Sequence, residues 1–154
     1  LALCLRYTSD RELARDALQE CFINAFRFIG KYKGKGSFEG WLKRIAVTSS
    51  ISLNKKFKQI YFEEVKEDST WEHAVVPDIY STMGKEEIMV VLKQLPDSLY
   101  LVFNMYVVEG YQHYEIAEVL GITESTSRSA LCKARNRLAL LIKKQDEVLV
   151  AQAS

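Results

Sequence analysis

The stretch EIAEVLGITESTSR, residues 115–128, reads as an amphipathic helix that stops at a glycine and a second helix that starts with polar residues. Ser and Thr suit a helix interior poorly, because their hydroxyl groups compete for backbone hydrogen bonds. At a helix start the same groups satisfy unpaired backbone N–H groups. Gly121 suits the turn between the helices. The stretch therefore predicts a helix–turn–helix unit whose second helix has two unusually polar turns and contacts another polar surface.

In such a unit the first helix braces the second, whose N-terminal residues reach base edges in the major groove of DNA. Ile116 and Leu120 belong to the expected bracing face, and Ile122 is the apolar plug between the helices. Five residues are expected to point outward and three more to meet phosphates: Ser125, Thr126, Arg128, Ser129 and Cys132, then Lys133, Asn136 and Arg137. Plainer interpretations stay open. Ser125 and Thr126 could simply cap the helix, and Arg128 could be a solvated charge.

The net charge of +1 conceals a strong asymmetry along the chain. Residues 31–58 hold eight Lys or Arg against one Glu, giving +7, and residues 121–144 hold six against one, giving +5. Between them, residues 59–84 hold one Lys against six acids, giving −5. Two basic blocks separated by an acidic one favour two contacts with a polyanion, although a solvated lysine-rich face would have the same composition.

Apolar residues at helical intervals predict a first long helix from about residue 10 to residue 29. Its start carries the spacing of a capping box, from Ser9 to Glu12. The residues of the expected apolar face are Leu13, Ala17, Leu18, Cys21, Phe22, Ala25, Phe26 and Ile29. Gly30 should end this helix.

A glycine-lysine loop, KYKGKGS, follows, and Ser37 is the expected cap of the next helix. Phe38 and Trp41 lie on the apolar side of that helix. The residues of its polar side are Arg44, Thr48, Ser52 and Lys55 or Lys56.

From about Phe57 to Gly84 the helical periodicity fades while acids, Ser and Thr accumulate, which is typical of a linker. Periodicity returns at Lys85. Pro96 suits the first position of a further helix, which should run to Glu109, just before Gly110.

The chain is therefore predicted to be all-α, with two small helical domains joined by a linker and the helix–turn–helix in the second domain. The expected divisions are a first helical domain at 1–57, an acidic linker at 58–84, the helix–turn–helix domain at 85–145 and a tail at 146–154. The sequence opens inside an apolar run, LALCLRY, without a starting Met. We therefore expect the first domain to lack part of its N-terminus.

The reactive residues argue against catalysis, a metal or a cofactor. The three cysteines, Cys4, Cys21 and Cys132, are far apart and form no C-x-x-C pair, which disfavours disulfides and suits a reducing cytoplasm. His73 and His113 have no Cys or carboxylate cluster at metal-ligand spacing. No phosphate-binding loop, dinucleotide fingerprint or nucleophile elbow is present in the sequence. No stretch approaches eighteen apolar residues, so membrane insertion is not expected.

The first basic block interleaves lysines with aromatic residues in KYKGKGSFEGW. Basic residues that follow a backbone, with aromatic rings on which bases stack, suit unpaired single strands. Phe38 and Trp41 also fit the buried stripe of their helix, so Tyr32, on the loop, is the better stacking candidate.

Two parts of the chain resemble a known family. The runs ARDALQECFINAF and GSFEGWLKRIA resemble region 2 of extracytoplasmic-function sigma factors, the dissociable initiation subunits of bacterial RNA polymerase. The run LKQLPDSLYLVFNMYVVEGYQHYEIAEVLGITESTSRSALCKARNRL resembles region 4 of the same family. Two separate resemblances in the order of the family are far more specific than either alone.

The resemblance implies a subunit that binds core RNA polymerase and opens promoter DNA, without covalent chemistry of its own. The residues that it implies for docking on the polymerase clamp helices are Asp16, Gln19, Glu20 and Asn24. Those implied for the minus-ten element are Lys31, Tyr32, Lys33, Lys35, Arg44, Thr48, Ser52 and Lys55. The helix from Glu124 to Arg137 corresponds to the reader of the minus-thirty-five element. The resemblance also implies an anti-sigma factor as a further partner.

The chain departs from the family pattern at several positions. Ser52 replaces an Asp, Ser127 replaces a core Val, and Ala130 lacks a base or phosphate contact. These changes concern the promoter sequence rather than the fold. The competing interpretation is a helix–turn–helix regulator that binds duplex DNA without polymerase, but such a regulator does not need residues 10–57. A protein-interaction adaptor is disfavoured by the two basic blocks.

Overall fold

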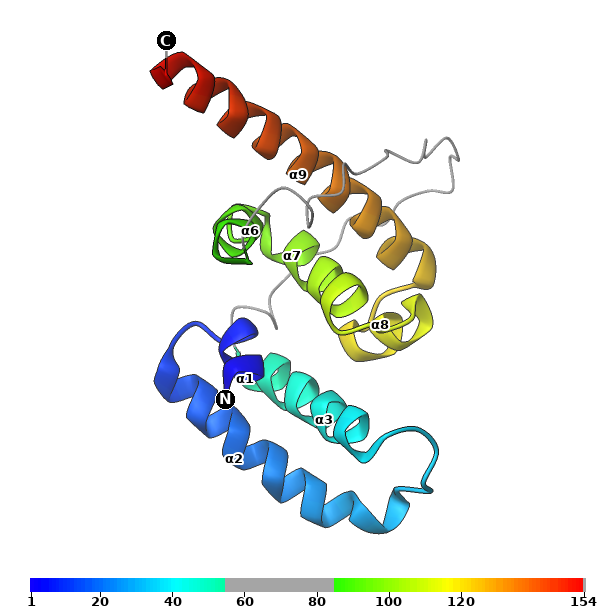
Figure 1. Cartoon of the computed structure of the whole chain (residues 1–154). Helices are drawn as coiled ribbons and strands as arrows, with labels where there is room; N and C mark the ends of the chain where they lie inside the picture. The colour runs from blue at the N-terminus through cyan, green and yellow to red at the C-terminus, as the bar shows by residue number, and fades with distance from the viewer. Residues whose placement is uncertain (55–84, 154) are drawn as a thin grey trace. The chain divides into compact units, whose positions relative to one another are not determined.

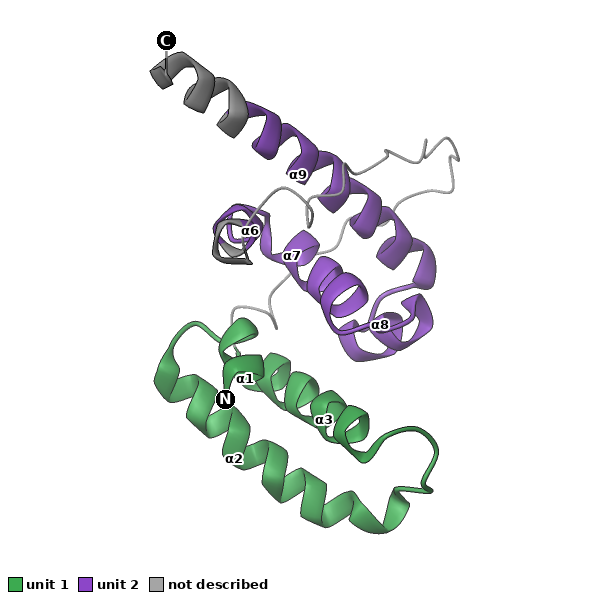
Figure 2. Ribbon diagram, in the orientation of Figure 1, with its two compact units in different colours: residues 1–60 green, residues 61–154 purple. Residues whose placement is uncertain are grey.

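The computed structural model describes residues 1–54 and 85–153, with the backbone alone at residues 85–87 and 89 and from residue 145 onward. Every regular element in these ranges is helical, so the predicted all-α class is confirmed for the described chain (Figure 1). The helices fall into two compact units, residues 1–60 and residues 61–154 (Figure 2). The acidic linker predicted at 58–84 lies outside the described residues, as does Lys55.

Unit 1 is built from α1 (Ala2–Arg6), α2 (Arg11–Phe28), a 3-10 turn η1 (Ile29–Lys31) and α3 (Phe38–Leu53). The cap of α2 is Asp10, whose carboxylate accepts a hydrogen bond from the Leu13 N–H at 2.8 Å, one residue later than the predicted Ser9. Ser37 caps α3 as predicted, accepting from the Gly40 N–H at 3.0 Å.

Small side chains form the core of unit 1. Ala14, Ala17 and Cys21 line one face of α2 and pack with Cys4 of α1 and Ala46 of α3. Because these side chains are short, the helix backbones can approach closely. A larger residue at Ala17 would overpack this contact and lower the free energy of unfolding by about 1–3 kcal/mol.

Leu18 packs against this core as predicted, but three of the large residues predicted on the apolar face lie outside it, which corrects that face. Phe22, Phe26 and Ile29 are 47%, 77% and 49% exposed. The sequence offers more apolar positions than one helix stripe can bury, and the small residues occupy the stripe that faces α1 and α3. These exposed apolar side chains are therefore available for contacts outside the core of unit 1.

Unit 2 contains α6 (Lys85–Leu92), α7 (Asp97–Phe103), a π-helical segment η2 (Asn104–Val108), α8 (His113–Leu120) and α9 (Glu124–Ala153). Gly121 adopts φ +67°, the left-handed conformation that ends α8, and the Ile122 N–H donates to the Ala117 carbonyl at 3.1 Å. The turn predicted from the glycine is therefore present.

The core of unit 2 lies between α7, η2, α8 and the first half of α9. Its fully buried side chains include Leu101 and Met105, Ile116 of α8 and Ala134 of α9. The backbone of α9 continues to Ala153, so the residues predicted to form a tail at 146–154 are helical up to that point.

Candidate nucleic-acid interface

The first turn of α9 is fixed by a threonine pair. The Thr123 hydroxyl accepts from the Thr126 N–H at 3.0 Å, and the two hydroxyl oxygens lie 2.8 Å apart. Thr126 is consequently buried, with 7% of its surface exposed. The expectation that Thr126 points outward is wrong, because its hydroxyl completes the cap of its own helix.

Ser129 is likewise turned inward, with 4% of its surface exposed. Its hydroxyl oxygen is buried and has no hydrogen-bond partner among the described residues. Position 129 follows Thr126 at the spacing of three that places both residues beside the buried stripe of α9. The outward position predicted for Ser129 is therefore also wrong.

Arg128 does point outward, with its side chain 60% exposed, as the sequence predicts. Its Nη2 donates to Oε2 of Glu124, one turn earlier, at 2.7 Å. A guanidinium can bind two acceptors in one plane, which is how arginine recognises guanine in the major groove. Arg128 thus presents a group able to pair with a base at the start of α9, held by the acidic Glu124.

A polar link joins the starts of α8 and α9. His113 Nδ1 and the hydroxyl oxygen of fully buried Ser127 lie 2.9 Å apart and share a hydrogen bond. The His113 ring also stacks on Tyr106, with centroids 4.5 Å apart and planes 22° apart. Ser127 stands where the family pattern has Val, and His113 supplies the partner that a buried hydroxyl needs.

The environment of His113 favours its neutral form. Burial lowers the pKa of His113 below its ordinary value of 6.5, and the positive charge of Arg128 lowers it further. Glu124 opposes this shift and Arg135 adds to it. The link between α8 and α9 is therefore made by an uncharged imidazole at neutral pH.

The remaining predicted residues of α9 differ in exposure. Ser125, Cys132 and Lys133 are half-buried, whereas Asn136 and Arg137 are exposed. The basic residues continue to the exposed Lys143 and Lys144. Basic side chains therefore follow Arg128 along α9, and groups of this kind suit contacts with phosphates.

The basic loop of unit 1 holds an aromatic cluster. Tyr32 lies 5.6 Å from Phe38 and 5.4 Å from Trp41, measured between ring centroids, and Phe38 and Trp41 are 5.5 Å apart. The Tyr32 hydroxyl donates to the Gly36 carbonyl at 2.9 Å. Tyr32 is therefore a half-buried member of the cluster, whereas Phe38, expected in the core, is 47% exposed.

The lysines of the loop, Lys31, Lys33 and Lys35, are all exposed around this cluster. On α3, Arg44, Thr48 and Ser52 are exposed at intervals of four, so they share one face of the helix. The Thr48 hydroxyl donates to the Arg44 carbonyl at 2.9 Å. The structure thus brings together a basic loop with aromatic rings and a polar helix face.

The four residues predicted on α2 form two groups. Asp16 and Gln19 are exposed. Asn24 instead donates from Nδ2 to Glu20 Oε1 at 3.0 Å and lies 3.4 Å from Ser49 Oγ of α3. Glu20 and Asn24 therefore help to join α2 to α3, while Asp16 and Gln19 face outward.

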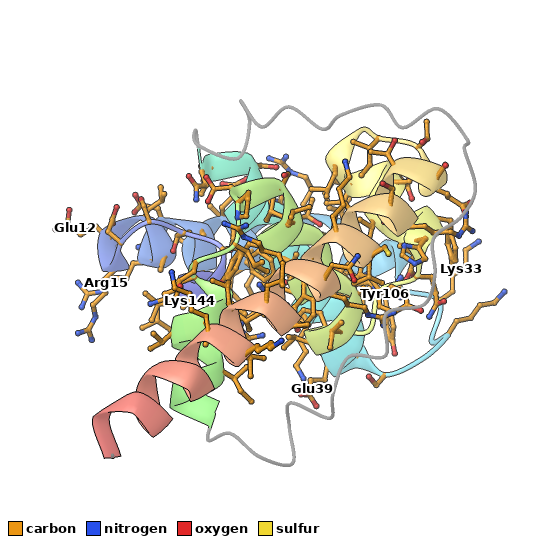
Figure 3. The ribbon with its side chains drawn as sticks, turned by 90° about the horizontal axis from the view of Figure 1, so that it is seen from above. Glu12, Arg15, Lys33, Glu39, Tyr106 and Lys144 are labelled. Carbon is orange, nitrogen blue, oxygen red and sulfur yellow. The ribbon has the colours of Figure 1, made fainter. Side chains whose placement is uncertain are left out.

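Two apolar residues share this outer face: Ile23, to which the sequence pattern gave no role, and Phe26, which the pattern placed on the buried side. Ile23 and Phe26 are 53% and 77% exposed and continue the spacing of Asp16 and Gln19 by steps of four and three. Figure 3 shows Glu12 and Arg15 of α2 projecting away from the ribbon. The signal was present in the sequence, because the apolar residues of α2 are too many for one buried stripe.

Within the described ranges no cluster of three or more His, Cys, Asp or Glu side chains could hold a metal ion. None of the described helices has the length and apolar character needed to cross a membrane.

Comparison with known proteins gives a family match for each unit. Residues 1–56 match sigma-70 region 2, and residues 85–138 match sigma-70 region 4. The RNA polymerase sigma-H factor of Pseudomonas aeruginosa is 31% identical over 150 residues, covering 90% of this chain and 77% of that protein. The ECF RNA polymerase sigma factor SigM of Bacillus subtilis is 28% identical over 138 residues, covering 89% of this chain and 84% of that protein.

Two solved structures share the fold at low sequence identity. The sigma factor RpoE in complex with the anti-sigma factor NepR, from Bartonella quintana, superposes with a TM-score of 0.59 at 19% identity, covering 92% of this chain and 88% of that chain. CnrH in complex with the cytosolic domain of CnrY gives a TM-score of 0.52 at 16% identity, covering 92% and 79%.

Proposed function

Because this chain belongs to the extracytoplasmic-function sigma factors, we propose that its two units divide the work of promoter recognition between melted and duplex DNA. The protein binds core RNA polymerase, recognises the minus-ten and minus-thirty-five elements and promotes DNA opening. The observation that carries this conclusion is the match of both units, in the order of the family. A regulator that only binds duplex DNA would not need unit 1.

In unit 2, α9 reads the minus-thirty-five element. Arg128 is the residue that contacts a base, with half-buried Ser125 beside it at the helix start. Lys133, Asn136 and Arg137 contact phosphates and fix the register of the helix on the duplex. Thr126 and Ser129 shape the helix from within and do not reach a base.

In unit 1, the aromatic cluster receives an unpaired base of the minus-ten element. Phe38 offers the most open ring, while Tyr32 supports it from the loop. Lys31, Lys33 and Lys35 then attract the strand to which that base belongs. The exposed face of α3, from Arg44 to Ser52, lies along the same element, and Lys55 belongs to this set by sequence alone.

The outer face of α2 binds core polymerase. Asp16 and Gln19 provide polar contacts, and Ile23 and Phe26 provide apolar area further along the same face. Apolar anchors surrounded by polar residues are the usual arrangement of a protein–protein interface. Glu20 and Asn24 contribute by holding α2 against α3.

Three further attributes follow from the family. We infer that the protein performs no covalent chemistry, works in the cytoplasm with RNA polymerase, and is held inactive by an anti-sigma factor. The last inference is supported by the similar fold of RpoE, which was solved in complex with the anti-sigma factor NepR.

Run-off transcription with purified core polymerase tests the proposal. We expect specific transcripts from a promoter pool only when this protein is added. Retention of duplex binding without any polymerase-dependent transcript would favour the regulator instead.

A further inference from the structure

We propose that Glu124 sets the base specificity of the upstream promoter contact by holding the Arg128 guanidinium over the first turn of α9. This inference rests on the proposed function, because it assumes that α9 enters the major groove. It adds a residue with a defined role, and that role is to position Arg128 and not to contact DNA.

The geometry of the pair fixes where the guanidinium lies. Arg128 Nη2 and Glu124 Oε2 are 2.7 Å apart, at a sequence spacing of four. Side chains on a helix lean toward its N-terminus, so Arg128 reaches back across the turn that begins α9. That end of a recognition helix is the part that meets base edges.

The backbone beneath the pair is anchored on both sides. The Thr123–Thr126 cap fixes the first turn, and the hydrogen bond between Ser127 and His113 joins it to α8. The nearby His113 imidazole, on which the charges of Arg128, Glu124 and Arg135 act, is largely neutral at neutral pH. The Arg128 guanidinium donates to Glu124 from this anchored turn, so Glu124 directs the Arg128 side chain.

The carboxylate has two effects on DNA binding. It restricts the rotamers of Arg128, which lowers the entropy lost when the guanidinium pairs with a base. It also repels phosphate oxygens. If the guanidinium turned toward the DNA backbone, the Glu124 carboxylate would be left unpaired near a negatively charged phosphate. Both effects favour base contact over phosphate contact. Their influence on folding is small, because exposed ion pairs contribute little to stability.

The test measures base preference with holoenzyme assembled from core polymerase and the full chain. The probe is a pool of promoter duplexes with a randomised upstream element, and bound sequences are counted at several salt concentrations. Arg128→Ala first identifies the base pair that this residue reads. At that same position we expect Glu124→Gln to reduce the preference about two- to fivefold, the range that exposed ion pairs support.

Binding to non-preferred sequences should change in the opposite direction. Because the released guanidinium can neutralise a phosphate, we expect Glu124→Gln to bind such duplexes more tightly and to steepen the salt dependence by up to about one counterion. A variant that had merely damaged the helix would lose affinity for all sequences. Glu124→Ala should give the same result, which excludes a new contact from the glutamine amide.

Two controls isolate the pair. In the Arg128→Ala background, Glu124→Gln should cause no further change in preference at that position. Glu39→Gln in α3 removes an ion pair of the same spacing and the same 2.7 Å length, to Lys43, and should leave the upstream preference unchanged.

An unchanged upstream profile for Glu124→Gln, or an equal loss at every position, would overturn the role of Glu124. A wild-type holoenzyme that shows no upstream preference at all would instead overturn the proposed function of α9, and Glu124 would then have no specificity to set.

Discussion

At the scale of single residues, the start of α9 shows that a polar side chain need not face a polar partner outside the protein. Thr126, Ser127 and Ser129 are all buried, and two of the three hydroxyls have partners within unit 2. Arg128 alone among the predicted base-contacting residues combines exposure with a side chain that can bind a base in two places. The surface that we propose to read bases is therefore smaller than the sequence suggests.

Arg128→Ala should remove the preference for one upstream base pair, at a cost of roughly 1–3 kcal/mol in discrimination. Arg137→Ala, at an exposed position further along α9, should weaken binding equally across sequences and flatten its salt dependence by about one counterion. Both variants are compared as holoenzymes by titration of labelled promoter duplexes. An equal loss for every base with Arg128→Ala would make Arg128 a phosphate contact.

Ser127→Ala should destabilise unit 2 by about 1 kcal/mol, because His113 Nδ1 loses its partner at a half-buried position. Ser52→Ala in α3 is the matched control, because it also replaces Ser by Ala within a helix, and so raises helix propensity equally, but at an exposed site. The difference between their unfolding free energies in urea isolates the buried hydrogen bond. Identical values for the two variants would show that the Ser127–His113 contact contributes nothing.

At the scale of elements, each helix uses its faces for different purposes. The small residues of α2 determine how closely it packs in unit 1, while its outer face carries Asp16, Gln19, Ile23 and Phe26. The start of α8 holds the start of α9 through His113. A face can thus be assigned only when its neighbours in the fold are known.

The stability of unit 2 should depend on pH through His113. Because the folded state lowers its pKa, the unfolded chain binds the proton more readily between the folded-state value and about 6.5. Stability should therefore be complete above this window and decrease as the pH falls through it. Thermal unfolding of the wild type and of His113→Gln over this range checks the sign, and equal pH dependence in the two would exclude His113 as the cause.

Ile23→Ala should weaken binding to core polymerase while leaving the helical circular-dichroism signal and the unfolding midpoint nearly unchanged, because the side chain is 53% exposed. Ile29→Ala is the matched control, being the same residue type at 49% exposure beyond the end of α2. Fluorescence anisotropy with labelled protein measures both. Equal affinity for Ile23→Ala and wild type would remove Ile23 from the docking face.

At the scale of the whole molecule, two helical units carry separate basic surfaces that suit different forms of one promoter. The aromatic cluster of unit 1 suits unpaired bases, and the exposed side of α9 in unit 2 suits a duplex. One polymerase-bound subunit can therefore contact a promoter before and after strand separation.

Variants in the two units should consequently affect different steps. Phe38→Ala should reduce strand opening more than promoter occupancy, since base stacking contributes on the order of 1–3 kcal/mol per base. Arg128→Ala should reduce occupancy first. Permanganate footprinting, compared with filter binding at matched occupancy, separates the steps. Normal opening by Phe38→Ala at equal occupancy would show that the ring does not hold a base.

The all-helical class, the glycine turn at Gly121, the cap at Ser37 and the family could all be predicted from the sequence. These features depend on local chemistry or on long patterns, and each can be recognised without knowing what packs against it. The exposed position of Arg128 could be predicted for the same reason, because helical spacing places it away from the apolar stripe of α9.

The tertiary structure alone decided which side chains those helices bury. The sequence placed Phe22 and Phe26 in the core and Thr126 and Ser129 on the surface, and the fold reversed all four. Periodicity indicates that a helix has an apolar side, but the neighbouring helices select which of several apolar stripes is covered. In α2 the covered stripe consists of alanine and cysteine, because short side chains allow the closest backbone approach. In α9 the buried stripe of Ala130, Leu131, Ala134 and Leu138 is joined by Thr126 and Ser127, whose hydroxyls find hydrogen-bond partners in Thr123 and His113.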